Sequence, residues 1–177
     1  MKLVSYLLIG AGTYFIVRGL TLGTAEAADI PAASQQFYSN KPKWEYTSDD
    51  IWQAIIEASR KFNIDPNFLS AIAEVESHWD PRAVDPAHSS FGVMQMTMPT
   101  AKWMGYTGNE EGLYNPYTNV YYAAKYLAWL RDRPNVNGDL RKMAMGYNGG
   151  PDLGPVSITS RYADKVMTAY YKLRGGK

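Results

Sequence analysis

The chain has 177 residues and no cysteine, which excludes disulfide bonds and thiolate catalysis. Its 18 basic and 17 acidic residues give a net charge of +1, without the clustered basic excess that marks nucleic-acid binding. We therefore expect no nucleic-acid partner. The length suits one small folded domain of about 130 residues behind a leading segment.

The leading segment, residues 1–28, has the features of an export signal. Lys2 precedes an apolar run, and small residues surround a candidate cleavage site after Ala27. Residues 3–22 are also just long enough to cross a bilayer, with Arg18 near one end. The sequence thus leaves open a cleaved signal peptide and an uncleaved inner-membrane anchor. Both predict an exported protein in the periplasm.

Residues 29–47 are rich in Ala, Ser and Lys without an apolar period, which is typical of a linker. Residues 48–173 contain a succession of apolar faces at helical spacing, the first of them behind Ser48 as a plausible cap. Apart from the helix described next, these faces comprise Ile51, Ala54, Ile55, Ala58 and Phe62; Val120, Ala123, Ala124, Leu127 and Leu130; Leu140, Met143, Ala144 and Tyr147; and Tyr162, Val166, Ala169, Tyr170 and Leu173. No run alternates long enough to predict a sheet. The expected fold is a single, mainly helical domain.

The segment from Asp65 to Ser77 predicts a helix with one chemically distinctive residue. Asp65 can cap it, and the apolar stripe that includes Leu69 reaches Glu76 two turns later. Glu74 falls on the opposite face and should meet water. A carboxyl group held against an apolar wall has a raised pKa and can stay protonated near neutral pH. Glu76 is therefore a candidate general acid.

The polar loop after this helix and several later motifs resemble the soluble lytic transglycosylase family, relatives of goose-type lysozyme. The resemblance spans roughly residues 48–173. Its motifs, in the family's order, are Glu76-Ser77; Pro81-Arg82-Ala83; Gly92-Val93-Met94-Gln95 with Pro99-Thr100-Ala101; Leu113-Tyr114-Asn115-Pro116 with Asn119; Ala144 to Pro151; and Arg161 to Val166.

The resemblance implies a lysozyme-like helical domain with a substrate cleft, acting on peptidoglycan glycan strands. It implies that Glu76 alone cleaves the bond between N-acetylmuramic acid and N-acetylglucosamine without water, leaving 1,6-anhydromuramyl ends. No cofactor is expected, and we expect a monomer. The implied substrate-binding residues are Ser77, Met94, Gln95, Tyr147, Asn148 and Tyr162.

The sequence also leaves two other functions open. A goose-type muramidase would hydrolyse the same bond and need a second carboxylate, for which Asp85 is the candidate, standing where many family members have serine. A wall-binding or assembly protein would not need a desolvated acid. A zinc site is not expected, since the chain has only two histidines, His78 and His88. The sequence leaves the biological role open between wall turnover, a secretion or conjugation machine, and a phage particle. A contact with the inner membrane, the envelope or the virion is a possible further partner.

Overall fold

The computed structural model of this protein describes residues 7–8, 13–14 and 45–175. The chain divides into two units, residues 1–31 and residues 32–177. In the first unit, β1 (Leu7–Leu8) pairs antiparallel with β2 (Thr13–Tyr14).

Most of the predicted export signal and linker, residues 1–47, lies outside the described residues, so both stay predictions. Within the described part of the chain, no helix is both long and apolar enough to cross a membrane.

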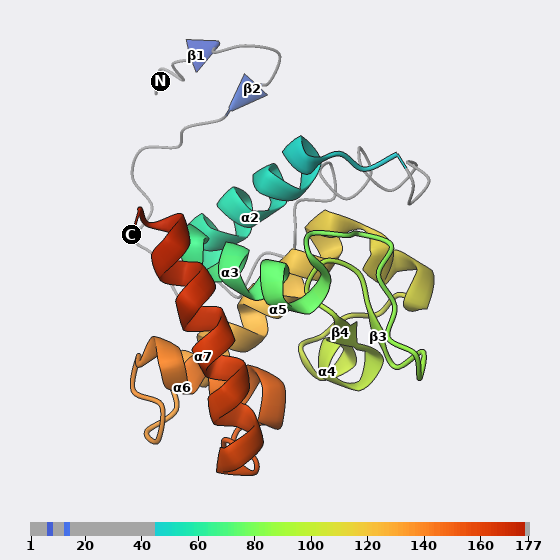
Figure 1. Ribbon diagram of the computed structural model, residues 1–177. Coiled ribbons are helices and arrows are strands. Elements are labelled where there is room, and N and C mark those ends of the chain that lie inside the picture. Colours follow the sequence, from blue (N-terminus) through green and yellow to red (C-terminus); the bar gives the residue numbers. More distant parts are fainter. Residues whose placement is uncertain (1–6, 9–12, 15–44, 176–177) are drawn as a thin grey trace, which may run out of the picture. The chain divides into compact units, whose positions relative to one another are not determined.

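The second unit is mainly helical, as predicted (Figure 1). Its elements in chain order are α2 (Ser48–Phe62), α3 (Pro66–Ser77), β3 (Ser90–Phe91), β4 (Met96–Thr97), α4 (Met98–Trp103), the 3-10 helix η1 (Glu110–Tyr114), α5 (Pro116–Arg131), α6 (Leu140–Gly149) and α7 (Val156–Leu173). Helix α7 packs against both α3 and α6, and α2 packs against α5.

The core is built on α3, whose residues 68 to 73 are all buried. Asp65 caps this helix as predicted, with its side chain accepting a hydrogen bond from the Asn67 N–H, and Pro66 opens the first turn. The largest fully buried side chains of the domain include Ile55, Phe68, Leu69, Ile72, Leu127, Leu130 and Met143. Because the middle of α3 is fixed in the core, the turn that follows it is held in place.

Two details of the predicted helices are wrong. The cap of α2 is Thr47 rather than Ser48: Thr47 and Asp50 form a reciprocal capping box, which satisfies two backbone N–H groups at once. Leu173, predicted on the buried face of the last helix, is 46% exposed. The buried residues of α7 end at Tyr170, so its final turn extends past the core.

A short hairpin that the sequence did not predict carries one of the motifs. Ser90 pairs with Thr97 and Phe91 with Met96, in strands too short to show alternation. The connection between the strands is Gly92 to Gln95, so the hairpin holds this loop beside the end of α3.

Candidate active site

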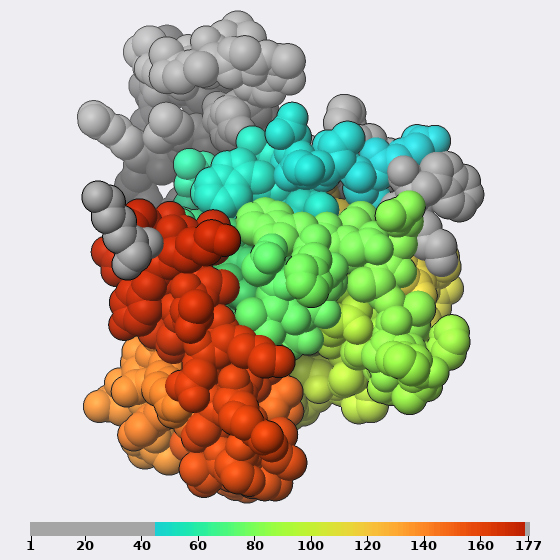
Figure 2. All heavy atoms as spheres, in the orientation of Figure 1, coloured from blue at the N-terminus to red at the C-terminus, as the bar shows by residue number. Residues whose placement is uncertain are grey.

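Glu76 lies in the last turn of α3, partly buried, while Glu74 is exposed. The predicted difference between the two glutamates is confirmed, because Leu69 and Ile72 on the Glu76 face are fully buried. The Tyr162 hydroxyl, from α7, donates a 2.6 Å hydrogen bond to Glu76 Oε1. In Figure 2, α7 in red borders the green surface that contains the end of α3 and the following loop.

The surroundings of Glu76 favour its protonated form. Burial raises the pKa of Glu76 to about 7, and the hydrogen bond from Tyr162 opposes that rise only in part. Burial and then the nearby Glu76 carboxyl raise the pKa of Tyr162 well above its ordinary value. Tyr162 therefore stays a neutral donor, and Glu76 can hold or release a proton near neutral pH.

The end of α3 is fixed by an abrupt change in backbone direction. His78 and Trp79 both adopt left-handed conformations, with φ of 53° and 66°, and this ends the helix directly after Ser77. The Ser77 hydroxyl donates to the Val93 carbonyl at 2.7 Å and lies 3.3 Å from the Ala73 carbonyl. Ser77 therefore ties the Glu76 turn to the hairpin loop.

Asn119 organises the hairpin loop from beneath. Its amide is fully buried, donates to the carbonyls of Phe91 (2.7 Å) and Leu113 (2.8 Å), and accepts from the Met94 N–H at 2.7 Å. Gly92 has φ of 72°, and a Cβ there would lie 2.4 Å from the Leu113 carbonyl oxygen. Sequence reasoning noted Asn119 only within a motif. Its signal was a polar residue in the otherwise apolar, buried face of α5.

Gln95 uses its side chain inside the loop. Its amide nitrogen donates to the carbonyls of Ala83 (3.1 Å) and Gly92 (2.9 Å), and its amide oxygen accepts from the Ser90 hydroxyl at 2.9 Å. Gln95 also has φ of 47°. Both amide hydrogens are thus engaged by the protein itself.

Tyr147, from α6, joins the loop to the opposite side of the site. Its hydroxyl donates to the Met94 carbonyl at 2.8 Å and lies 3.4 Å from Met96 Sδ. Burial and then Glu76 raise the pKa of Tyr147 well above its ordinary value. Met94 is fully buried, and its backbone N–H and carbonyl are bonded to Asn119 and Tyr147, so it packs inside the protein.

Asn148 differs from the other candidates because it is exposed and has no hydrogen bond to any described residue through its side chain. Behind it, the chain turns tightly: a Cβ on Gly149 would lie 2.4 Å from Thr159 Cγ2 and 3.0 Å from Gly154 Cα. The two glycines therefore let the end of α6 approach the start of α7.

The Asp85 side chain forms its hydrogen bonds within its own turn. Its carboxylate accepts hydrogen bonds from the backbone N–H groups of Ser90 (2.7 Å), Ser89 (2.6 Å) and Ala87 (3.2 Å), and from the Ser89 hydroxyl (3.0 Å). These contacts, led by that from the Ser90 N–H, lower the pKa of Asp85 to about 2. Asp85 is an ionised turn residue.

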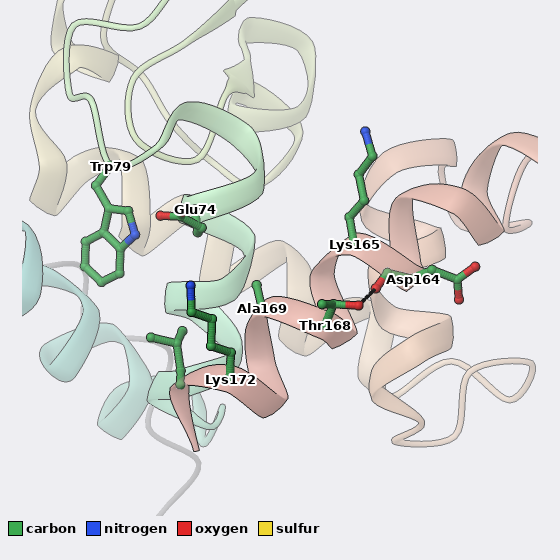
Figure 3. Close-up of a pocket in the computed structure, with 8 residues that line it drawn as sticks. Glu74, Trp79, Asp164, Lys165, Thr168, Ala169 and Lys172 are labelled. Carbon is green, nitrogen blue, oxygen red and sulfur yellow. Dashed lines mark hydrogen bonds between the residues drawn. The ribbon is translucent and has the colours of Figure 1, made fainter. Parts of the chain in front are cut away.

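No three His, Asp or Glu side chains of the described residues come together as a metal-binding group. Among the grooves lined by described residues are two on the surface, and Glu76 lines neither of these. One, of about 560 Å³, is lined by Glu74 and Trp79 and, on α7, by Lys165, Thr168 and Lys172 (Figure 3). The other, of about 590 Å³, lies between the hairpin, α4 and η1.

The fold is that of the soluble lytic transglycosylases. The 70 kDa soluble lytic transglycosylase from Escherichia coli superposes with a TM-score of 0.61 at 20% identity, over 73% of this chain and 24% of that one. An inactive mutant of lytic transglycosylase Slt from Pseudomonas aeruginosa gives a TM-score of 0.60 at 18% identity, over 70% of this chain and 24% of that one.

The transglycosylase SLT domain family matches residues 53–166, and the chain belongs to that family. It is 32% identical over 117 residues to the transglycosylase of Enterobacteria phage PRD1, covering 66% of this chain and 41% of the relative. It is 30% identical over 132 residues to invasion protein IagB of Salmonella typhimurium, covering 71% of this chain and 78% of the relative. It is also 35% identical over 77 residues to membrane-bound lytic murein transglycosylase F of Hahella chejuensis, covering 44% of this chain and 14% of the relative. The chain thus spans less than half the length of the phage and membrane-bound relatives.

Proposed function

We propose that this protein is a peptidoglycan lytic transglycosylase in which Glu76 performs both proton transfers. The observation that carries the proposal is the partly buried Glu76 carboxyl, with a pKa of about 7 and a hydrogen bond from Tyr162. Membership of the SLT domain family supports the choice of substrate and reaction. The bond cleaved is the β-1,4 link between N-acetylmuramic acid and N-acetylglucosamine.

The reaction needs one acid that later serves as a base. Protonated Glu76 donates its proton to the oxygen that links the two sugars, and that bond breaks. The muramyl acetamido oxygen stabilises the positive charge at C1. The Glu76 carboxylate then removes the proton from the muramyl C6 hydroxyl, whose oxygen bonds to C1 and closes a 1,6-anhydro ring. Glu76 regains its proton, and no water is consumed.

The other residues bind the substrate or hold the acid. Tyr162 stabilises the Glu76 carboxylate that forms midway, because its hydroxyl donates to that group. Asn148 is free to hydrogen-bond the acetamido group. Tyr147 lines the site and fixes the Met94 backbone. Ser77 and Gln95, whose side chains are engaged by the hairpin loop, act by shaping the surface against which the sugar lies.

Hydrolysis by a goose-type muramidase is the second candidate. That reaction needs a carboxylate to position water, and Asp85 was the candidate for it. Four hydrogen bonds from its own turn occupy the Asp85 carboxylate and hold its pKa near 2. Such a group is a weak base, which supports the non-hydrolytic reaction.

The setting proposed is local opening of the wall from the periplasmic side. Relatives include the transglycosylase of a phage, an invasion protein and a membrane-bound murein enzyme, in keeping with specialised roles in phage entry or secretion. We propose glycan strands as the partner, export by residues 1–28, residues 48–173 as the catalytic domain, and action as a monomer.

Glu76→Gln and Glu74→Gln form a matched pair that tests this function. The amide at position 76 keeps its shape but cannot supply a proton, so release of soluble fragments from purified sacculi should fall by at least about 10²-fold. Glu74→Gln should retain nearly full activity, because Glu74 is exposed and lines a groove that does not include Glu76. Similar activities for the two variants would refute the proposed role of Glu76.

A further inference from the structure

A row of aromatic rings leads away from Tyr147 across three helices. The Tyr147 ring, on α6, lies 5.8 Å from that of Tyr126 on α5. Trp129, one turn further along α5, stacks on Tyr126 at 6.0 Å with an interplanar angle of 14°. Trp103, the last residue of α4, packs edge-on against Trp129 at 4.6 Å and against Tyr126 at 6.0 Å. Helix α5 contacts both α4 and α6 (Figure 1), so the row connects these helices.

The rings of this row differ in how much surface they offer to a ligand. Tyr126 is buried, and its hydroxyl donates to the Gly146 carbonyl at 3.2 Å. Trp129 is covered by Tyr126 and by the Arg133 guanidinium, which lies 4.8 Å from its ring centroid. Trp103 is 55% exposed. Trp103 is therefore the ring with a surface free for binding.

The exposed ring of Trp103 is also held in one orientation. A single exposed apolar side chain needs no special explanation on a protein surface. Trp103, however, is braced by two neighbouring rings, and a tryptophan with only two side-chain torsions loses little entropy on binding. A braced aromatic face suits a ligand that has an apolar face and polar edges, as a pyranose ring has.

We propose that Trp103 forms a further saccharide subsite, which binds an N-acetylated sugar ring of the glycan strand beyond the bond cleaved at Glu76. This inference rests on the proposed function, because a polymeric substrate necessarily continues past the catalytic residue. Two ring-to-ring steps of 6.0 and 5.8 Å, through Tyr126, separate Trp103 from Tyr147. Because Tyr126 is buried, these steps are not a path over the surface, but they place Trp103 close enough to Tyr147 for one extended strand to contact both rings.

Substrates of two lengths test the subsite. We compare the wild type, Trp103→Ala and Trp103→Phe on long solubilised glycan strands and on the shortest strand fragment that is cleaved. Trp103→Ala should raise KM about 3- to 10-fold on the long strands and leave the short fragment unaffected, while Trp103→Phe should stay within about twofold. Trp52→Ala is the matched control, since Trp52 is 40% exposed on α2 and outside the row. It should leave both substrates unaffected.

A binding measurement separates failure of the subsite from failure of the proposed function. Calorimetric titration of a Glu76→Gln variant with the hexamer of N-acetylglucosamine reports binding without chemistry. Adding Trp103→Ala to it should weaken binding about 3- to 10-fold. Unchanged binding, or equal losses on long and short strands, would overturn the subsite. A wild type that cleaves neither substrate would instead overturn the proposed function, and the titration would still decide whether Trp103 binds sugar.

Discussion

Glu76 is held in surroundings that oppose its ionisation, and this affects stability as well as activity. The folded state raises its pKa from 4.5 to about 7, so the folded protein binds this proton more tightly than the unfolded chain does. The resulting stabilisation is complete below pH 4.5 and is lost as the pH rises through 7. At one pKa unit per 1.36 kcal/mol, the loss amounts to roughly 3 kcal/mol.

Glu76→Gln should therefore remove a pH dependence along with the activity. Its free energy of unfolding, measured by urea denaturation, should exceed that of the wild type by about 1 to 3 kcal/mol at pH 8, and the advantage should shrink progressively between pH 7 and pH 4.5. Glu74→Gln should follow the wild-type curve, since Glu74 is exposed. A pH-independent difference between Glu76→Gln and the wild type would mean that Glu76 ionises normally.

Gln95 and Asn148, both predicted to hold the substrate, should respond differently to substitution. Gln95→Ala removes the side-chain donor to the carbonyls of Ala83 and Gly92, which each keep a backbone donor, and it leaves the Ser90 hydroxyl without its acceptor. The loss of these three hydrogen bonds should lower stability by about 1 to 3 kcal/mol. Asn148→Ala removes an exposed side chain and should lower turnover without moving the melting temperature. Calorimetry beside a wall-lysis assay checks both variants. A stable Gln95→Ala or an unstable Asn148→Ala would reverse these assignments.

At the scale of elements, the hairpin loop depends on one buried side chain of α5. Asn119→Ala would remove the acceptor of the Met94 N–H and the side-chain donor to the carbonyls of Phe91 and Leu113. We expect a loss of about 2 to 4 kcal/mol in unfolding free energy and a larger fall in activity than stability alone explains, since the Glu76 turn rests on this loop. Gln53→Ala on the exposed face of α2 is the control and should change stability by less than about 0.5 kcal/mol. Unaltered activity per folded molecule would show that the loop tolerates the loss.

The elements also show where sequence reasoning succeeds and where it stops. The face of α3 that carries Glu76 followed from helical periodicity, because Leu69 and Ile72 belong to the same local repeat. The roles of Asn119 and Gln95 did not follow, since their partners lie in other parts of the loop or up to 28 residues away. The cap of α2 lies one residue before the predicted Ser48, because Thr47 has a reciprocal partner in Asp50 and Ser48 does not.

At the scale of the whole domain, the site joins parts of the chain that are far apart in sequence. Glu76 and Tyr162 are separated by 86 residues, and the packing of α7 against α3 brings them together. The family resemblance indicated both residues, but only the fold shows the direct contact between them.

We propose that Glu76 alone carries the reaction, without water as a reactant. Digestion of purified sacculi in ¹⁸O-enriched water, followed by mass spectrometry of the released fragments, tests it most directly. The expected fragments carry no label and are one water lighter than reducing ends, and Asp85→Asn should yield the same products within about tenfold of the wild-type rate, short of the loss typical of a missing general base. Labelled reducing ends that disappear with Asp85→Asn would contradict the claim and identify a hydrolase.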